Sequence, residues 1–239
     1  MSRKSLLLAI AISVTLLGSV CLTVLLLIFH EPFFYRRAGV DEGEARQRAS
    51  QEFLQEFNLL INGILNDKTW SAQFSETQIN SYFAEDFRRL EKTIFPEQVG
   101  NPRVSIDTDR IRLAFRYGSK NWNTIVSLDM RIWLAAKEPN VVVLELQAMR
   151  LGSLPITVQS VLEHFSEAAR RLDIDLSWHR HNGKPAAVVR FVPGRTEPSV
   201  QLMHVKLLPG MITLHGADRS KPPSAEPAPA SVPAAAAKS

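Results

Sequence analysis

Few residues of this 239-residue chain combine the side-chain types and spacing that catalysis requires. His179 and His181 flank a single arginine and would lie on one side of an extended strand. Two imidazoles are fewer than the three or four protein ligands that a zinc site usually has. His164 and Glu167 stand three residues apart on a predicted helix, but no second such pair completes a binuclear site. We interpret both pairs as polar surface residues and predict no metal or other cofactor.

Common catalytic motifs are absent from the sequence. It contains no glycine-rich phosphate loop, no Gly-x-Ser-x-Gly elbow, no His-Glu-x-x-His helix, no Ser-x-x-Lys and no Cys-x-x-Cys. Cys21 is the only cysteine and lies inside a long apolar run. A disulfide scaffold is therefore excluded, as is a catalytic thiol outside the membrane. These absences predict a protein that is not an enzyme.

Arginines form the most distinctive polar pattern. Along residues 110–117 they alternate with apolar side chains, so they share one face of a predicted strand. Further arginines lie just upstream and on the predicted neighbouring strand, and the whole set is Arg103, Arg110, Arg112, Arg116 and Arg131. A solvated sheet face explains such a row. The alternative is attraction to phosphate headgroups or to an anionic polymer. A formal net charge of only +4 argues against nucleic acid as a partner.

The predicted strand at residues 140–149 is nearly all apolar, so it places apolar groups on both faces. Either another layer covers both faces, or one face lines an apolar groove. The helix predicted at residues 158–172 is available as that layer. The candidate groove residues, on this strand and its predicted neighbour, are Leu128, Met130, Ile132, Val142, Leu144 and Leu146.

The element that precedes all of these is an apolar segment. Residues 6–29 carry no charge. As a helix they would span about 36 Å, more than a hydrocarbon core of about 30 Å. Aromatic residues at 33–35 and arginines at 36–37 follow, as is typical of a membrane–water interface. We interpret the segment as an uncleaved transmembrane helix, and the alternative is a cleaved signal peptide.

The predicted orientation of the transmembrane helix depends more on the size of the domain that follows it than on the flanking charges. Arginines after the helix, counted alone, favour a cytoplasmic domain, but long domains translocate largely regardless of flanking charge. We therefore predict a cytoplasmic stub at residues 1–5 and a domain on the extracytoplasmic side of the inner membrane. The absence of cysteine from this domain is compatible with an oxidising compartment.

Residues 41–216 are predicted to form one α+β domain, joined to the helix by a juxtamembrane linker at 30–40. Periodicity predicts three helices, over 41–66, from Ser75 to a stop at Pro96, and over 158–172. Alternation predicts about eight strands in an antiparallel sheet, with a hairpin at Asn182 and Gly183. Residues 217–239 are rich in proline and alanine and are predicted to be a disordered tail.

Two short segments point to a family. FSETQINSY at residues 74–82 and RLGSLPI at 150–156, in this order of parts, resemble the YpmS-like family of bacterial single-pass membrane-anchored proteins. The chain resembles, more loosely, envelope lipid-binding domains of the LmeA and AsmA type. The resemblance covers most of residues 54–216. It implies an extracytoplasmic domain that holds lipid in a curved sheet, and it carries over no catalytic residues.

We therefore predict a non-enzymatic envelope protein that binds lipid or a lipid-linked polymer near the membrane. Its predicted partners are its own membrane and that ligand. The alternative is an accessory or scaffold subunit that positions an envelope enzyme or transporter through its helices.

Overall fold

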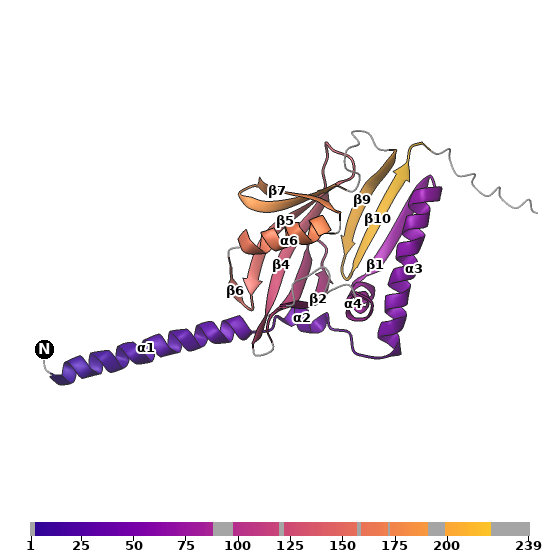
Figure 1. Cartoon of the computed structure of the whole chain (residues 1–239). Helices are drawn as coiled ribbons and strands as arrows, with labels where there is room; N and C mark the ends of the chain where they lie inside the picture. Colours follow the sequence, from indigo (N-terminus) through magenta and orange to yellow (C-terminus); the bar gives the residue numbers. More distant parts are fainter. Residues whose placement is uncertain are drawn as a thin grey trace, which may run out of the picture.

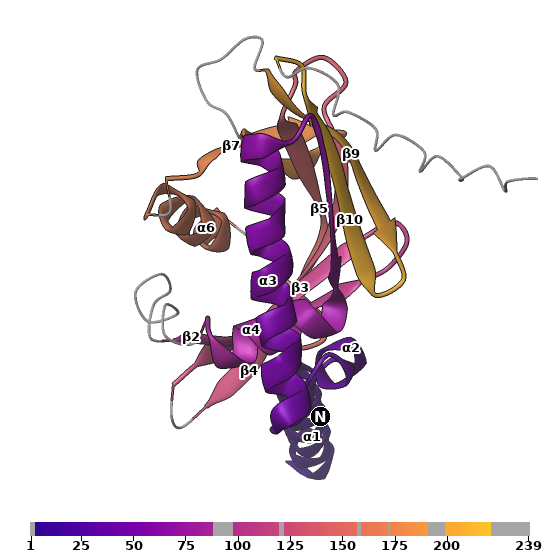
Figure 2. The same ribbon diagram turned by 90° about the vertical axis from the view of Figure 1, so that its right-hand side faces the viewer.

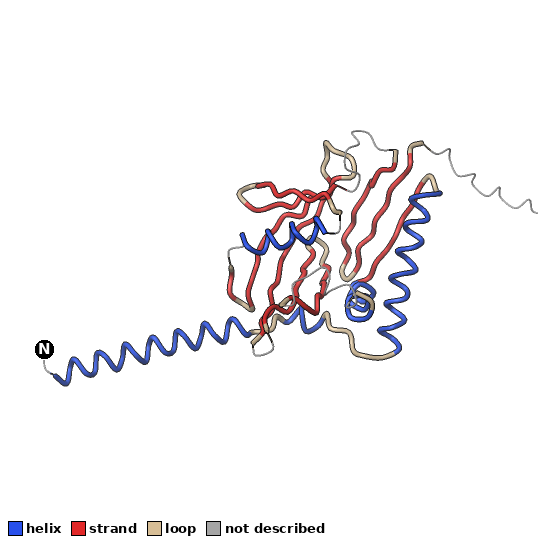
Figure 3. The backbone as a smooth tube through the Cα atoms, in the orientation of Figure 1, coloured by secondary structure: helices blue, strands red, loops and turns tan. Residues whose placement is uncertain are grey.

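The computed structural model describes residues 3–87, 98–119, 122–156, 159–171, 173–190 and 199–220. Within these ranges ten strands form two antiparallel sheets, with helices packed beside them (Figures 1 and 3). The α+β class is thus confirmed, but the prediction of a single sheet is wrong. The predicted second helix beyond residue 87 and most of the predicted tail, from residue 221, lie outside the described ranges.

Helix α1, Arg3–Phe29, extends away from the rest of the molecule (Figure 1). It is long and apolar enough to cross a membrane, and a signal sequence near the N-terminus can also be this long and apolar. Helix α2, Phe33–Arg37, follows after three residues. The segment predicted as a linker therefore contains a helical turn, and Tyr35 in it is completely buried.

The larger sheet has the strand order β2-β3-β4-β5-β8-β7, and β6 pairs with β5. Its strands are β2 Val99–Ile106, β3 Ile111–Gly118, β4 Asn123–Leu134, β5 Val141–Leu151, β6 Leu154–Pro155, β7 Asp175–His181 and β8 Lys184–Arg190. The predicted hairpin is confirmed, because Asn182 and Gly183 join β7 to β8 with φ of 50° and 78°. This left-handed conformation is the one that Asn-Gly favours in a two-residue turn.

Helix α6, Gln159–Arg171, covers one face of this sheet. Leu162 and Phe165 of α6 pack against a buried cluster in β3, β4 and β5 that comprises Phe115, Val126, Leu128, Leu146 and Met149. Of the predicted groove residues, Leu128, Val142 and Leu146 are buried, and Met130 packs against the same cluster. Ile132 and Leu144 remain partly exposed. For most of the six positions the structure favours a covering layer over a groove.

The smaller sheet has the order β1-β10-β9, with β1 Thr69–Ser75, β9 Val200–Leu208 and β10 Met211–Asp218. Strand β10 thus runs past the domain boundary predicted at residue 216. Helix α3, Glu44–Asn66, lies along this sheet (Figure 2) and buries Leu60 against Trp70 and Phe74. Helix α4, Glu76–Glu85, begins at the predicted capping box, since the Ser75 hydroxyl accepts from the Gln78 amide.

Two side-chain amides bind the backbone of edge strands. Asn80 of α4 exchanges two 2.8 Å hydrogen bonds with the backbone N–H and C=O of Val104 in β2. Asn140, just before β5, accepts from the Leu202 N–H and donates to the Val200 carbonyl of β9, both at 2.7 Å. Each amide occupies the place of a neighbouring strand. Asn140 links the larger sheet to β9 directly, and Asn80 links β2 to the helix that follows β1.

Candidate functional site at the root of α1

The carboxyl end of α1 is docked onto the larger sheet. The Ser153 N–H donates to the Leu27 carbonyl at 2.8 Å, and the Thr124 hydroxyl donates to the Ile28 carbonyl. The last four carbonyls of a helix have no partner within the helix, so the domain satisfies two of them. A Cβ atom on Gly152, at φ +60°, would lie 2.3 Å from each of these carbonyl oxygens. Only glycine permits this approach, which explains the glycine in the Leu-Gly-Ser-Leu-Pro segment.

Arginines of the larger sheet hold the segment after α1. The Arg103 guanidinium lies 4.3 Å from the centre of the Tyr35 ring and donates to the Tyr35 carbonyl at 2.7 Å. Arg112 lies 4.7 Å from the Phe34 ring and forms a 2.7 Å ion pair with Asp107. Such cation–π contacts are favourable within about 6 Å. These arginines therefore contact the chain's own aromatic residues.

The three remaining predicted arginines differ in whether they contact the segment after α1. Arg116 lies 3.7 Å from the Glu31 carboxylate and so also contacts the segment after α1. Arg110 and Arg131 are exposed. Arg110 pairs with its neighbour Asp109, and this hydrogen bond lowers the pKa of the Asp109 carboxyl. Within the described ranges, three of the five predicted arginines, Arg103, Arg112 and Arg116, therefore contact the segment after α1, and Arg110 and Arg131 do not. In the sequence, the signal for the contacts of Arg103 and Arg112 is the group of aromatic residues directly after the apolar helix.

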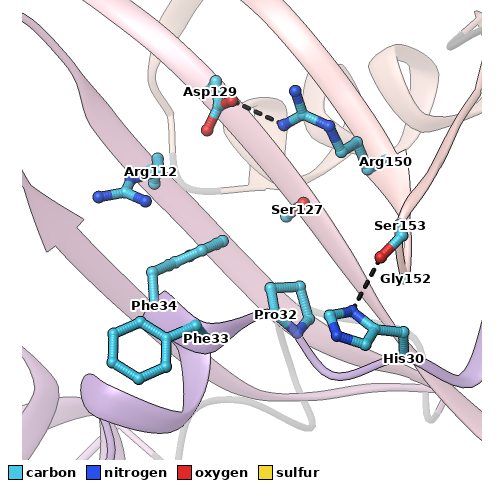
Figure 4. Close-up of a pocket in the computed structure, with 10 residues that line it drawn as sticks. All are labelled: His30, Pro32, Phe33, Phe34, Arg112, Ser127, Asp129, Arg150, Gly152 and Ser153. Carbon is cyan, nitrogen blue, oxygen red and sulfur yellow. Dashed lines mark hydrogen bonds and ion pairs between the residues drawn. The ribbon is translucent and has the colours of Figure 1, made fainter.

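A cavity of about 290 Å³ lies between this segment and the sheet (Figure 4). Arg150 forms a 2.8 Å ion pair with Asp129, and the His30 Nδ1 lies 2.8 Å from the Ser153 hydroxyl. The cavity is lined by His30, Pro32, Phe33, Phe34, Arg112, Ser127, Asp129, Arg150, Gly152 and Ser153. Of these residues, only Arg112 was among the predicted site residues.

Register explains why these polar groups meet. Arg112 of β3 pairs with Asp129 of β4, and Ser127 of β4 pairs with Arg150 of β5. Three adjacent strands thus present one carboxylate, with one guanidinium group on each side of it. The Asp129 side chain is 11% exposed, whereas that of Arg150 is 44% exposed. With five N–H donors, Arg150 can pair with Asp129 and still bind an anionic group in the cavity.

A second polar cluster lies farther along the larger sheet. Glu145 is buried and its carboxylate accepts a hydrogen bond from the Nδ1 of His181, whose ring centre is 5.4 Å from the ring centre of Trp133. The hydrogen bond from His181 lowers the pKa of the Glu145 carboxyl. The His179 ring lies 3.2 Å from the Ser177 hydroxyl instead. In the described part of the chain, no group of three or more potential ligands could hold a metal ion.

No family model, curated protein or solved structure matches this chain. The likeness to YpmS-like proteins and to lipid-binding envelope domains therefore remains a prediction. The functional proposal therefore rests on the geometry at the carboxyl end of α1.

Proposed function

We propose that the chain is a non-enzymatic, single-pass envelope protein that binds lipid or a lipid-linked polymer at the membrane surface. In this proposal α1 crosses the inner membrane and the domain lies on its extracytoplasmic side. The observation that carries the proposal is the cavity where α1 ends, which two guanidinium groups and one carboxylate line.

Depth supports this assignment. A helix that crosses the hydrocarbon core ends among the headgroups, and the cavity begins with His30, one residue after α1. Phosphate groups are bound well by guanidinium groups, because a planar fork of donors matches two phosphate oxygens. Phe33, which is 69% exposed and lines the same cavity as Arg112 and Arg150, offers an apolar edge for the less polar part of a lipid.

Of the five predicted arginines, only Arg112 has a direct binding role in this proposal. Arg112 lines the cavity, whereas Arg103 and Arg116 act by holding the segment after α1. Arg110 and Arg131 remain exposed and can attract an anionic surface at longer range. The cavity, rather than the whole row, is the binding site in this proposal.

The test removes the charge pair of the cavity without leaving one buried charge alone. The double variant Asp129→Asn with Arg150→Gln should lower the affinity for dihexanoyl phosphatidylglycerol at least about tenfold. This magnitude assumes that one charge-assisted hydrogen bond of about 1.5–3 kcal/mol is lost. Native mass spectrometry of the full chain in detergent, across a lipid titration, measures the change.

Arg110→Gln is the matched control, because Arg110 is exposed and pairs only with adjacent Asp109 among the ion pairs of the described chain. Its affinity should equal that of the wild type. Inorganic phosphate, titrated in parallel, separates recognition of a lipid from recognition of the phosphate alone. Equal lipid affinity for the double variant and the wild type would rule out this cavity as the binding site.

One observation favours the alternative of an accessory or scaffold subunit. Phe57, Ile61 and Leu65 recur every four residues on α3 and are 45%, 40% and 65% exposed. An exposed apolar row on a helix is typical of a surface that packs against another helix. Loss of one stoichiometric protein partner on changing Ile61→Lys, with lipid binding unaffected, would favour this function.

A further inference from the structure

The hairpin between β3 and β4 carries two exposed aromatic side chains. Tyr117, near the end of β3, is 40% exposed, and Trp122, just before β4, is 47% exposed. The hairpin is tightly closed, since the Ser119 N–H donates to the Trp122 carbonyl at 2.8 Å. Gly118, at φ +147°, allows this closure, because a Cβ there would lie 2.3 Å from the Trp122 carbonyl oxygen. Residues 120–121 lie outside the described ranges.

This hairpin lies beside the end of α1. Thr124, the residue whose hydroxyl bonds the Ile28 carbonyl, is paired with Tyr117 and follows Trp122 by two residues. Figure 1 shows the start of β4 level with the end of α1, and Figure 2 shows the hairpin to one side of it. Phe29, the last residue of α1, is 51% exposed, and Phe33, the first residue of α2, is 69% exposed. Two separate parts of the fold therefore bring aromatic residues to one level.

Tryptophan and tyrosine are enriched where a membrane meets water, because their rings are apolar and their N–H or O–H group is polar. A soluble domain rarely gathers exposed aromatic side chains at one place without a partner. Tyr117 and Trp122 lie beside the end of a helix that is long and apolar enough to cross a bilayer, because Thr124, the partner of Tyr117, bonds to the Ile28 carbonyl. This proximity favours the same bilayer as the occupant.

We infer that the β3–β4 hairpin, through Tyr117 and Trp122, is a second membrane-contacting element that lies in the headgroup region beside α1. The inference rests on the anchoring by α1 that is part of the proposed function. A second contact with the bilayer, beside the docked end of α1, further restricts the tilt of the domain. The cavity at the root of α1 then keeps one orientation toward the lipid.

Depth measurements on the full chain test this inference. Because Cys21 is the only cysteine, Cys21→Ala provides a background for single labels. Trp122→Cys, carrying an environment-sensitive fluorophore, is reconstituted in vesicles of phosphatidylcholine and phosphatidylglycerol with doxyl-labelled lipid. We expect at least twofold stronger quenching at position 122 than at Met203→Cys. Met203 is similarly exposed, at 41%, on β9 of the other sheet.

Leu16→Cys, in the middle of α1, separates the possible results. Quenching at 16 and 122 but not at 203 supports the hairpin contact. Quenching at 16, with 122 as unquenched as 203, overturns the hairpin contact and leaves the anchor. Absence of quenching at 16 overturns the anchor and both proposals with it. Tyr117→Cys, labelled in the same background, gives an independent reading if the label at 122 disturbs the turn, and circular dichroism checks the fold of each variant.

Discussion

Replacement of Gly152 by alanine should release the end of α1 from the domain. A Cβ atom at this position would lie 2.3 Å from the Leu27 and Ile28 carbonyl oxygens, whereas ordinary contact begins at 3.4 Å. The end of α1 must therefore withdraw by about 1.1 Å. The bond from the Ser153 N–H to the Leu27 carbonyl, now 2.8 Å, would lengthen to well beyond the range of a hydrogen bond.

The expected magnitude follows from the bonds that are lost. Two hydrogen bonds to α1, from Ser153 and Thr124, contribute about 1 kcal/mol each, so local opening becomes easier by about 2 kcal/mol. That corresponds to about 30-fold faster exchange of the Ser153 amide hydrogen. The larger sheet should stay folded, because its ladder does not involve α1.

Hydrogen exchange with mass spectrometry, on the full chain in nanodiscs, measures this change in the peptide that contains residue 153. Gly183→Ala is the matched control, since Gly183 also has a left-handed φ, of +78°, but nothing lies within 4 Å of its Cβ position. Both substitutions incur about 1–2 kcal/mol of backbone strain, and only Gly152→Ala meets α1. Unchanged exchange at Ser153 in Gly152→Ala, or equal acceleration in both variants, would refute the reasoning.

Two further predictions concern the domain itself. Asn80→Leu should lower the free energy of unfolding by about 3 kcal/mol, because it leaves the buried Val104 N–H and C=O without partners. Urea unfolding in detergent measures this, and exposed Asn58→Leu should change it by less than about 0.5 kcal/mol; equal effects would contradict the prediction. The lowered pKa of Glu145 predicts that its carboxylate stabilises the fold above the ordinary glutamate pKa and that this contribution is lost as pH falls through the lowered value. Glu145→Gln should therefore show a smaller loss of stability than the wild type between about pH 5 and pH 3, and parallel curves would exclude the His181 contact as a source of acid sensitivity.

Local patterns predicted the elements well. Alternation in residues 110–117 and the Asn-Gly pair gave β3 and the β7–β8 hairpin, and the Ser75 capping box gave the start of α4. These features depend on neighbouring residues, so one sequence contains the information. The division into two sheets was not predictable in this way. It depends on β1 pairing with β10, more than a hundred residues away, and on the Asn80 and Asn140 amides.

The candidate site was predicted only in part. The arginine face was identified, but its contacts with Phe34 and Tyr35 depend on where α2 folds back. Arg150 and Asp129 are far apart in sequence and meet through the β4–β5 register, which a bulge between Asp129 and Met130 shifts. A single sequence does not reveal that shift, so the cavity could not be derived from it.

The amides of Asn80 and Asn140 have a consequence for contacts between copies of the chain. An unpaired strand edge is a place where a second copy can add a strand of its own. Asn80 occupies the backbone groups of Val104 at the rim of β2, and Asn140 does the same at Val200 and Leu202 of β9. A second chain therefore cannot extend β2 at Val104 or β9 at Val200 and Leu202 without displacing an asparagine.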